Sequence, residues 1–329
     1  MDARLSDVLQ RMQFNANHIS ELPLQGSWPA ASHCWSEPER DALILALACG
    51  RPLLVRGEPG AGKSQFARAV ARELGRGFLY EVVHPSIEAQ DLLWRYDAVE
   101  RLADAQRPGQ PLRPAKDYYR SGVLWKALDP VSAAIQDSAT PPSPQESVSG
   151  SIVLIDEIDK ADADLPHALL EVLGNQQFTT PWGAVIAAQG RPVPLIVITT
   201  NEERELPLAF VRRCLVLEIQ PPRQRAAFVD WLVQRGQARF PRLAPAVLDM
   251  AADQVARDRG RCPQDGARPG LAEYIDLLQA VSELSDDAAT QQGWLTRLGR
   301  FALRKQVDRT QPAVDWSDEE AEPDPGGAA

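Results

Sequence analysis

Residues 57–64 form a glycine-rich loop, Gly-Glu-Pro-Gly-Ala-Gly-Lys-Ser, that satisfies the pattern G-x-x-x-x-G-K-[ST]. An apolar run at residues 52–55 precedes the loop, and residues 65–74 follow it with apolar side chains at helical spacing up to Gly75. A phosphate-binding loop (P-loop) needs this context of strand, tight turn and helix, and the context argues against a chance match. The feature therefore predicts an α/β fold in which a buried strand leads into a nucleoside triphosphate site.

The residue types in the loop match the chemistry of phosphate binding. Glycines let backbone N–H groups turn inward around the phosphates, and the start of the following helix adds its positive end. We expect Lys63 to reach the β- and γ-phosphates and the Ser64 hydroxyl to ligate Mg²⁺. The predicted nucleotide contacts of this segment are Gly57, Glu58, Pro59, Gly60, Ala61, Gly62, Lys63, Ser64 and Gln65.

A second motif, residues 152–157, agrees with the first. Its apolar part, Ile-Val-Leu-Ile, is typical of a strand buried on both faces of a parallel sheet. Asp156 at the strand tip is expected to hold Mg²⁺ together with Ser64, and Glu157 to orient and deprotonate the attacking water. The alternative is a surface acidic pair that caps a helix predicted over Ile158–Leu173. The P-loop upstream favours the catalytic reading, known as a Walker B motif.

Composition limits the class of protein. The 329 residues are 44% hydrophobic and 24% charged, as in ordinary soluble domains, and no apolar stretch approaches the ~20 residues of a membrane span. The N-terminus lacks a signal-peptide layout, so we expect a cytoplasmic protein. The net charge of −10 argues against a broad nucleic-acid-binding face, although a local basic loop stays open. The four cysteines show no C-x-x-C spacing and are expected to be unpaired thiols.

The rest of the chain alternates predicted strands and helices. Residues 1–35 mix a short amphipathic segment with loop residues, and a capping box at Ser36–Glu39 precedes a helix over Arg40–Cys49. Residues 84–137 read as a helix with an inserted excursion, and residues 138–150 as a Pro- and Ser-rich loop. Further predictions are strands at 78–83, 195–200 and 214–219, a hairpin at 177–186, helices from 223 to about 308, and an acidic disordered tail at 309–329.

Four segments together resemble the AAA+ ATPases, and among them most closely the MoxR group. They are Gly57–Ser64, Ile152–Lys160, Thr199-Thr200-Asn201 and Ala209–Cys214, and the resemblance covers roughly residues 36–285. It implies an α/β P-loop αβα sandwich with a five-stranded parallel sheet, followed by a small all-α lid. The implied division is an N-terminal extension (1–35), a nucleotide-binding domain (36–222), a lid (223–308) and the tail (309–329). MoxR-like insertions would fall at residues 84–125 and in the 177–186 hairpin.

The resemblance also implies roles for residues outside the two motifs. Asn201 would be the sensor-1 residue that contacts the γ-phosphate or the attacking water. Arg213 would be an arginine finger that reaches the nucleotide of a neighbouring subunit, with Arg212 or a surface ion pair as alternatives. Arg268 is the candidate phosphate contact from the lid, although it stands before Pro269 where relatives carry arginine after proline. The implied activity is Mg²⁺-dependent ATP hydrolysis in a ring, with a hexamer as the expected size.

Three functions fit these residues. The first is an ATPase that remodels or activates a partner protein, in the chaperone-like manner of MoxR relatives. The second is a GTP-using, nucleic-acid-linked motor subunit that resembles McrB, against which the acidic charge and the lack of a basic domain count. The third is a signalling switch, in which ATP binding drives assembly of the protein and hydrolysis only resets it. Trp182, at the predicted hairpin tip, would either touch a substrate or pack against its own domain.

Overall fold

The computed structural model describes residues 18–107, 111–141, 150–162, 164–188, 190–262 and 268–302. Its centre is a five-stranded sheet in the order β11–β3–β10–β7–β4, and every neighbouring pair in the sheet is parallel. This arrangement confirms the predicted five-stranded parallel α/β fold. The strands are β3 (Leu53–Arg56), β4 (Gly77–Val82), β7 (Ser151–Asp156), β10 (Leu195–Thr200) and β11 (Leu215–Glu218).

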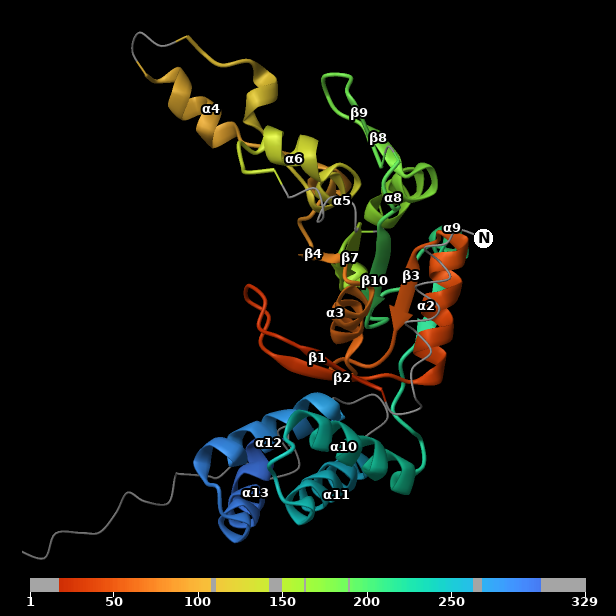
Figure 1. Ribbon diagram of the computed structural model, residues 1–329, viewed down its shortest axis with the longest axis vertical. Coiled ribbons are helices and arrows are strands. Elements are labelled where there is room, and N and C mark those ends of the chain that lie inside the picture. The colour runs from red at the N-terminus through yellow and green to blue at the C-terminus, as the bar shows by residue number, and fades with distance from the viewer. Residues whose placement is uncertain are drawn as a thin grey trace, which may run out of the picture.

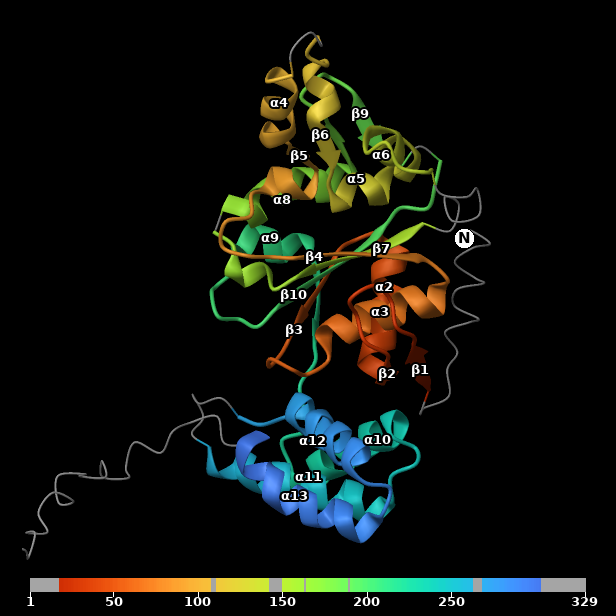
Figure 2. The same cartoon turned by 90° about the vertical axis from the view of Figure 1, so that its left-hand side faces the viewer.

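Both faces of the sheet are buried, which explains the continuous apolar runs of its central strands. Alternate side chains enter two cores: Leu54, Val153 and Ile155 enter one, and Leu53 and Ile152 enter the other. Helices α2 (Glu37–Cys49) and α3 (Lys63–Leu74) cover the second core, and α5 (Val123–Leu128), α8 (Asp164–Asn175) and α9 (Leu208–Arg213) cover the first (Figure 2).

Four of the described helices form a separate bundle beyond the sheet, in agreement with the predicted all-α lid (Figures 1 and 2). Leu232, Val247, Leu248, Tyr274 and Leu278 are fully buried in a core of their own. The helices are α10 (Arg225–Arg239), α11 (Pro245–Arg261), α12 (Leu271–Leu284) and α13 (Ala288–Ala302).

The N-terminal region differs from its prediction. Residues expected to be loop form an antiparallel hairpin of β1 (Ile19–Leu22) and β2 (Ala31–Cys34), which lies between α3 and the lid helix α10 (Figure 1). The indole N–H of Trp35 donates to the Ser20 hydroxyl at 2.6 Å and ties the two sides together. Each strand has only four residues, too few for a clear alternating pattern in the sequence. The amphipathic segment predicted near the N-terminus lies outside the described residues.

The helix predicted to begin at Ile158 is a second correction. Glu157 adopts a left-handed conformation (φ 60°, ψ 49°), and residues Ile158–Lys160 form a single 3₁₀ turn before α8. The buried Asp159 carboxylate accepts the backbone N–H groups of Asn201 at 3.1 Å and Glu203 at 3.0 Å. These long-range hydrogen bonds hold the turn toward β10, so the chain cannot continue directly from β7 into a helix.

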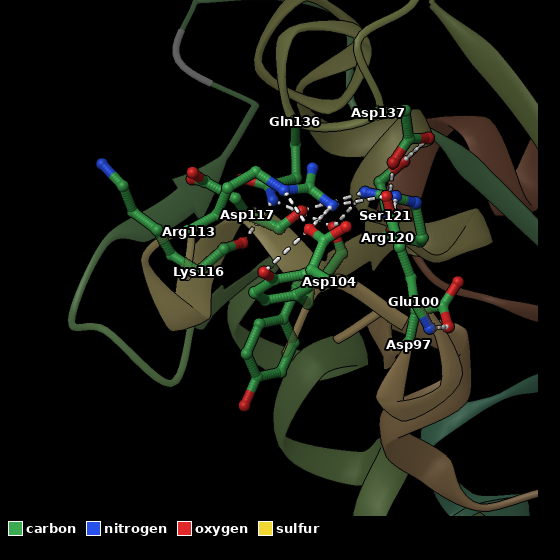
Figure 3. Close-up of polar contacts among 12 residues, drawn as sticks. Asp97, Glu100, Asp104, Arg113, Lys116, Asp117, Arg120, Ser121, Gln136 and Asp137 are labelled. Atoms are coloured by element: carbon green, nitrogen blue, oxygen red, sulfur yellow. Dashed lines mark hydrogen bonds and ion pairs between the residues drawn. The ribbon is translucent and has the colours of Figure 1, made fainter. Parts of the chain in front are cut away.

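The insertion between β4 and β7 projects from the end of the molecule opposite the lid (Figure 1). It holds β5 (Trp94–Tyr96) and β6 (Tyr119–Ser121), which pair antiparallel, with α4 (Ala98–Ala105) between them and α6 (Pro130–Gln136) after α5. Figure 3 shows Glu100 and Asp104 of α4 turned toward Arg113 and Arg120, with which they form ion pairs. The helix α4 therefore docks through its polar face. The sequence had predicted a helix with an inserted excursion over residues 84–137, and the pairing of β5 with β6 was not foreseen.

The predicted hairpin is present as β8 (Gln177–Thr179) and β9 (Val185–Ala187). Trp182 in its turn packs against Tyr119 and Trp125, with ring centroids 5.3 and 5.9 Å away. Of the two alternatives for Trp182, packing within its own domain is therefore the one observed. All four cysteines are unpaired, as predicted.

The domain division at residues 35, 222 and 308 stays a prediction. Its tail, the end of its lid and most of the Pro- and Ser-rich loop lie outside the described residues. None of the described helices combines the length and apolar character that crossing a membrane requires.

Candidate nucleotide-binding site

The loop between β3 and α3 requires glycine at defined positions. Gly57 has φ 148°, and a Cβ there would lie 2.1 Å from the carbonyl oxygen of Ile219. Gly60 has φ 74°, and its Cβ would lie 2.8 Å from the Cβ of Ala272 at the start of α12. A side chain at Gly57 would therefore push the loop away from the chain after β11, and one at Gly60 would push it away from the lid. The loop ends at Gly62, and α3 begins at Lys63 with its N-terminal amides facing the loop.

Lys63 lies at the centre of the loop and is 7% exposed. Its ammonium donates to the carbonyl oxygens of Gly57 at 2.8 Å and Glu58 at 2.9 Å, and to Oδ1 of Asn201 at 2.6 Å. Burial lowers the pKa of Lys63, and the Asp156 carboxylate opposes that shift by favouring the charged form. These three acceptors are oxygen atoms, and phosphate oxygens can take their place around the same ammonium.

Ser64 and Asp156 meet across two elements of the fold. The Ser64 hydroxyl, in the first turn of α3, lies 2.9 Å from both carboxylate oxygens of Asp156 at the end of β7. The Thr199 hydroxyl of β10 donates to the same carboxylate. Hydroxyl and carboxylate oxygens are the ligands that Mg²⁺ prefers, so this donor set fits the predicted ion.

Glu157 and Asn201 lie beside this pair because β7 and β10 are parallel neighbours. The Asn201 amide donates to Glu157 Oε1 at 3.3 Å and accepts from Lys63 on its other side. Lys160 holds the second oxygen of Glu157 at 2.8 Å. The structure thus brings the predicted residues Lys63, Ser64, Asp156, Glu157 and Asn201 together at one edge of the sheet.

A cavity of about 400 Å³ opens from the P-loop toward the lid. Three parts of the chain line it: the P-loop with the strand ends, the hairpin β1–β2, and the lid helices α10 and α12. The sequence predicted the first part and missed the hairpin, and it placed the lid contact at Arg268 instead of at the lid residues found here. The added lining residues are Trp28, Ala31, Ser32, His33 and Cys34 from the hairpin region, and Arg235, Arg239, Leu271, Ala272, Ile275 and Asp276 from the lid.

Arg259 of α11 is a further residue that sequence reasoning missed. Its Nη2 lies 2.7 Å from both carboxylate oxygens of Glu58 in the P-loop, and its Nη1 donates to the carbonyl of Pro269 at 3.1 Å. Arg259 therefore joins the lid to the phosphate-binding loop. Arg268, the predicted lid contact, is half-buried just before α12 and is absent from the residues that line the cavity. Its role at the phosphates stays a prediction.

Arg212 and Arg213 end helix α9 and are both exposed. Arg51 donates to their backbone carbonyls, at 2.5 Å for Arg212 and 3.1 Å for Arg213, and so anchors the C-terminal end of the helix. Neither arginine lines the cavity of its own chain. The choice of Arg213 as a finger toward a neighbouring chain stays a prediction.

Comparisons with known proteins give one family. Residues 52–214 match the family model described as the AAA domain of the dynein-related subfamily. None of the curated proteins compared with this chain matches it. Among solved structures, a mutant of RuvB from Thermotoga maritima is similar at 15% identity and a TM-score of 0.45, over 80% of this chain and 68% of that chain.

Proposed function

Because the chain carries an AAA domain, a nucleotide-dependent ATPase domain, over residues 52–214, we propose that it is a Mg²⁺-dependent ATPase of the MoxR-like type. In this proposal it assembles into a ring, expected to be a hexamer, and uses ATP binding and hydrolysis to remodel or activate a partner protein. The observation that carries the proposal is the contact of Ser64 with both oxygens of Asp156, beside the hydrogen-bonded series Lys63–Asn201–Glu157.

Each residue of this series has a task in hydrolysis. Lys63 and the loop amides hold the β- and γ-phosphates, while Ser64 and Asp156 hold Mg²⁺. When bound, the ion offsets the charge that develops on the phosphate oxygens. Glu157 accepts the proton of the attacking water, for which its carboxylate must exchange Lys160 for that water. Asn201, already between Lys63 and Glu157, orients the water toward the γ-phosphate.

The position of α9 supports the proposed ring. Since Arg212 and Arg213 are exposed and outside their own cavity, either guanidinium is available to a nucleotide bound by a neighbouring chain. An arginine that stabilises the transition state in this way accelerates hydrolysis by ~10³–10⁵-fold. We assign this role to Arg213 and use Arg212 as its matched control.

The free edge of β2 supports ATP as the substrate. Trp35 N–H donates to the carbonyl of His18, and these two residues are directly opposite each other in the register of the hairpin. Because hydrogen-bonded and non-hydrogen-bonded pairs alternate along an antiparallel hairpin, the next hydrogen-bonded pair is Ser20 with His33. Ser32 and Cys34 occupy the other positions, where N–H and C=O point away from β1, and both residues line the cavity. Adenine offers an acceptor beside an amino donor, whereas guanine replaces that amino group with a carbonyl. A backbone donor and acceptor from one residue therefore match adenine.

Asp276 of α12 favours the GTP alternative. Asp276 also lines the cavity, and a carboxylate is an acceptor suited to the ring N–H with an adjacent amino group that guanine presents and adenine does not. The two observations make opposite predictions for Asp276→Asn. If the base is adenine, this change leaves ATP turnover within about twofold, because Asn keeps the size of the side chain. If the base is guanine, it selectively removes GTP turnover.

The test measures ATP and GTP hydrolysis against protein concentration for wild type, Glu157→Gln, Arg213→Ala and Arg212→Ala. We expect ATP hydrolysis to rise more steeply than linearly with concentration. Glu157→Gln should bind ATP without turnover, and Arg213→Ala should lose turnover while Arg212→Ala keeps it. A rate linear in concentration and unchanged by Arg213→Ala would refute the shared site. A preference for GTP would favour the McrB-like alternative over the proposed ATPase. Loss of turnover only in Arg212→Ala would transfer the finger to that residue.

The Glu157→Gln variant also tests the partner. Held with ATP, it should retain a protein partner that wild type releases on hydrolysis. Stimulation of wild-type turnover by that partner is expected for a remodelling ATPase, whereas ATP-dependent assembly with no stimulation would indicate the switch.

A further inference from the structure

We infer that Arg68 is a positioning residue: it clamps the hairpin β1–β2 onto α3 and thereby shapes the base end of the nucleotide cavity. The inference rests on the proposed function only for the identity of the ligand. The clamp itself is a matter of contacts within this chain.

The Arg68 guanidinium holds both ends of the segment that joins β1 to β2. Its Nη2 donates to the carbonyl of Pro23 at 2.9 Å, and its Nη1 donates to the carbonyl of Pro29 at 3.1 Å. The same Nη1 lies 3.0 Å from Oε1 of Gln65, which fixes the plane of the guanidinium from within α3. The planar guanidinium carries its N–H donors on separate nitrogens, so it can hold Pro23 with one nitrogen and Pro29 and Gln65 with the other.

The guanidinium also lies against Trp28, with 5.4 Å between its central carbon and the ring centroid. From other directions Trp28 meets Phe78 and Tyr80 of β4 edge to face, at 5.9 and 5.3 Å. Trp28 is one of the residues that line the nucleotide cavity. Arg68 therefore supports a wall of the cavity directly, in addition to holding the backbone of the hairpin.

Burying the charged Arg68 guanidinium costs free energy unless hydrogen bonds or an ion pair compensate for the lost hydration. Arg68 is 3% exposed, its Nε has no hydrogen-bond partner, and no carboxylate among the described residues lies within ion-pair distance of it. Buried arginines are normally paired with an acid. Burial lowers the pKa of Arg68, and the neighbouring charge of Arg239, which lines the cavity, acts in the same direction. A carbonyl clamp explains an arginine here better than an ion pair does.

The clamp links the two ends of the proposed nucleotide site. Arg68 follows Ser64 by one helical turn, so a single helix carries both the phosphate contact and the support for the hairpin. The hairpin in turn presents the free edge at Ser32 and Cys34 to the cavity. Loosening the hairpin should weaken base recognition and leave the catalytic residues in place.

The experiment compares wild type with Arg68→Met, which keeps the apolar stem, and Arg68→Lys, which keeps the charge but not the fork. The matched control is Arg72→Met, an exposed arginine one turn further along the same helix. The first measurement is hydrogen exchange of residues 19–34 without nucleotide. We expect exchange to speed up at least tenfold in both Arg68 variants and to be unchanged in the control. The second is steady-state ATP and GTP hydrolysis, where KM for ATP should rise about tenfold with kcat within twofold, and selectivity between the nucleotides should fall.

The outcomes separate the clamp from the proposed function. Unchanged exchange in folded Arg68 variants would refute the clamp, whatever the enzyme does. Faster exchange with unchanged KM would refute its role at the cavity, and a fall in kcat without a change in KM would do the same. Full rescue by Lys would show that charge, and not the fork, is what matters. If neither variant folds, slower exchange at Ser32 and Cys34 when wild type binds ATP supports the inference, and its absence overturns it. A wild type that hydrolyses neither nucleotide would instead refute the proposed function.

Discussion

Asp159 joins the turn after strand β7 to the loop that carries Asn201, and its removal should damage both stability and the proposed ATP hydrolysis. The side chain is 2% exposed, and its Oδ2 accepts the backbone N–H groups of Asn201 at 3.1 Å and Glu203 at 3.0 Å. Its Oδ1 has no partner among the described residues. The carboxylate therefore forms two charge-assisted hydrogen bonds while also bearing a burial cost.

The magnitude follows from those two hydrogen bonds. Each is worth about 1.5–3 kcal/mol, and together they amount to about 3–6 kcal/mol. Water can replace the one at exposed Glu203, and removing a buried carboxylate recovers part of its desolvation cost, so we expect Asp159→Ala to lower the free energy of unfolding by about 2–3 kcal/mol. Displacement of Asn201 by about 1 Å would lower kcat by about 10²-fold.

The assay pairs urea unfolding with saturating ATP hydrolysis for Asp159→Ala and Asp159→Asn. The Asn side chain keeps one acceptor oxygen for the two backbone groups, so this variant should recover most of the stability and part of the turnover. ATP affinity should change little in either variant, because the P-loop is not disturbed. Wild-type turnover and stability in Asp159→Ala would refute the reasoning, and equal damage in both variants would show that the charge matters more than the acceptor.

Three further predictions concern other contacts. Ser64→Ala removes a hydroxyl 2.9 Å from Asp156 and should abolish the Mg²⁺ dependence of ATP binding, measured by titration with and without the ion. Arg259→Ala breaks the ion pair with Glu58 and should speed nucleotide release about tenfold in stopped-flow displacement, whereas Arg257→Ala should not. Burial raises the pKa of Glu39, but the adjacent His33 ring, 3.5 Å from its carboxylate, and hydrogen bonds from Ser36 lower that pKa by more. The stability it contributes should be present above pH ~4.3 and lost as pH falls further, and Glu39→Gln should flatten that part of the stability–pH curve.

The sequence by itself determined the features that depend on contiguous residues. The P-loop and the apolar strand ending in Asp156-Glu157 each lie within a few residues. Their local patterns predicted the parallel sheet and the two carboxylates that we propose to be catalytic. The four lid helices and the hairpin β8–β9 were found for the same reason. Their apolar spacing and turn residues are readable without knowledge of distant partners.

Only the tertiary structure decided the residues whose partners are remote in the chain. Arg259 meets Glu58 across 201 positions, and Arg68 meets Pro23 across 45. Asp159 accepts hydrogen bonds from residues more than 40 positions away, and these bonds hold residues 158–160 in a short turn where the sequence predicted the start of a helix. A side chain's local sequence does not specify which distant backbone it will face, because that depends on how sheet, hairpin and lid pack together. The predicted phosphate-binding residues could thus be identified from local motifs. The hairpin side of the cavity and the contact of Arg259 with Glu58 depend on how distant segments pack together.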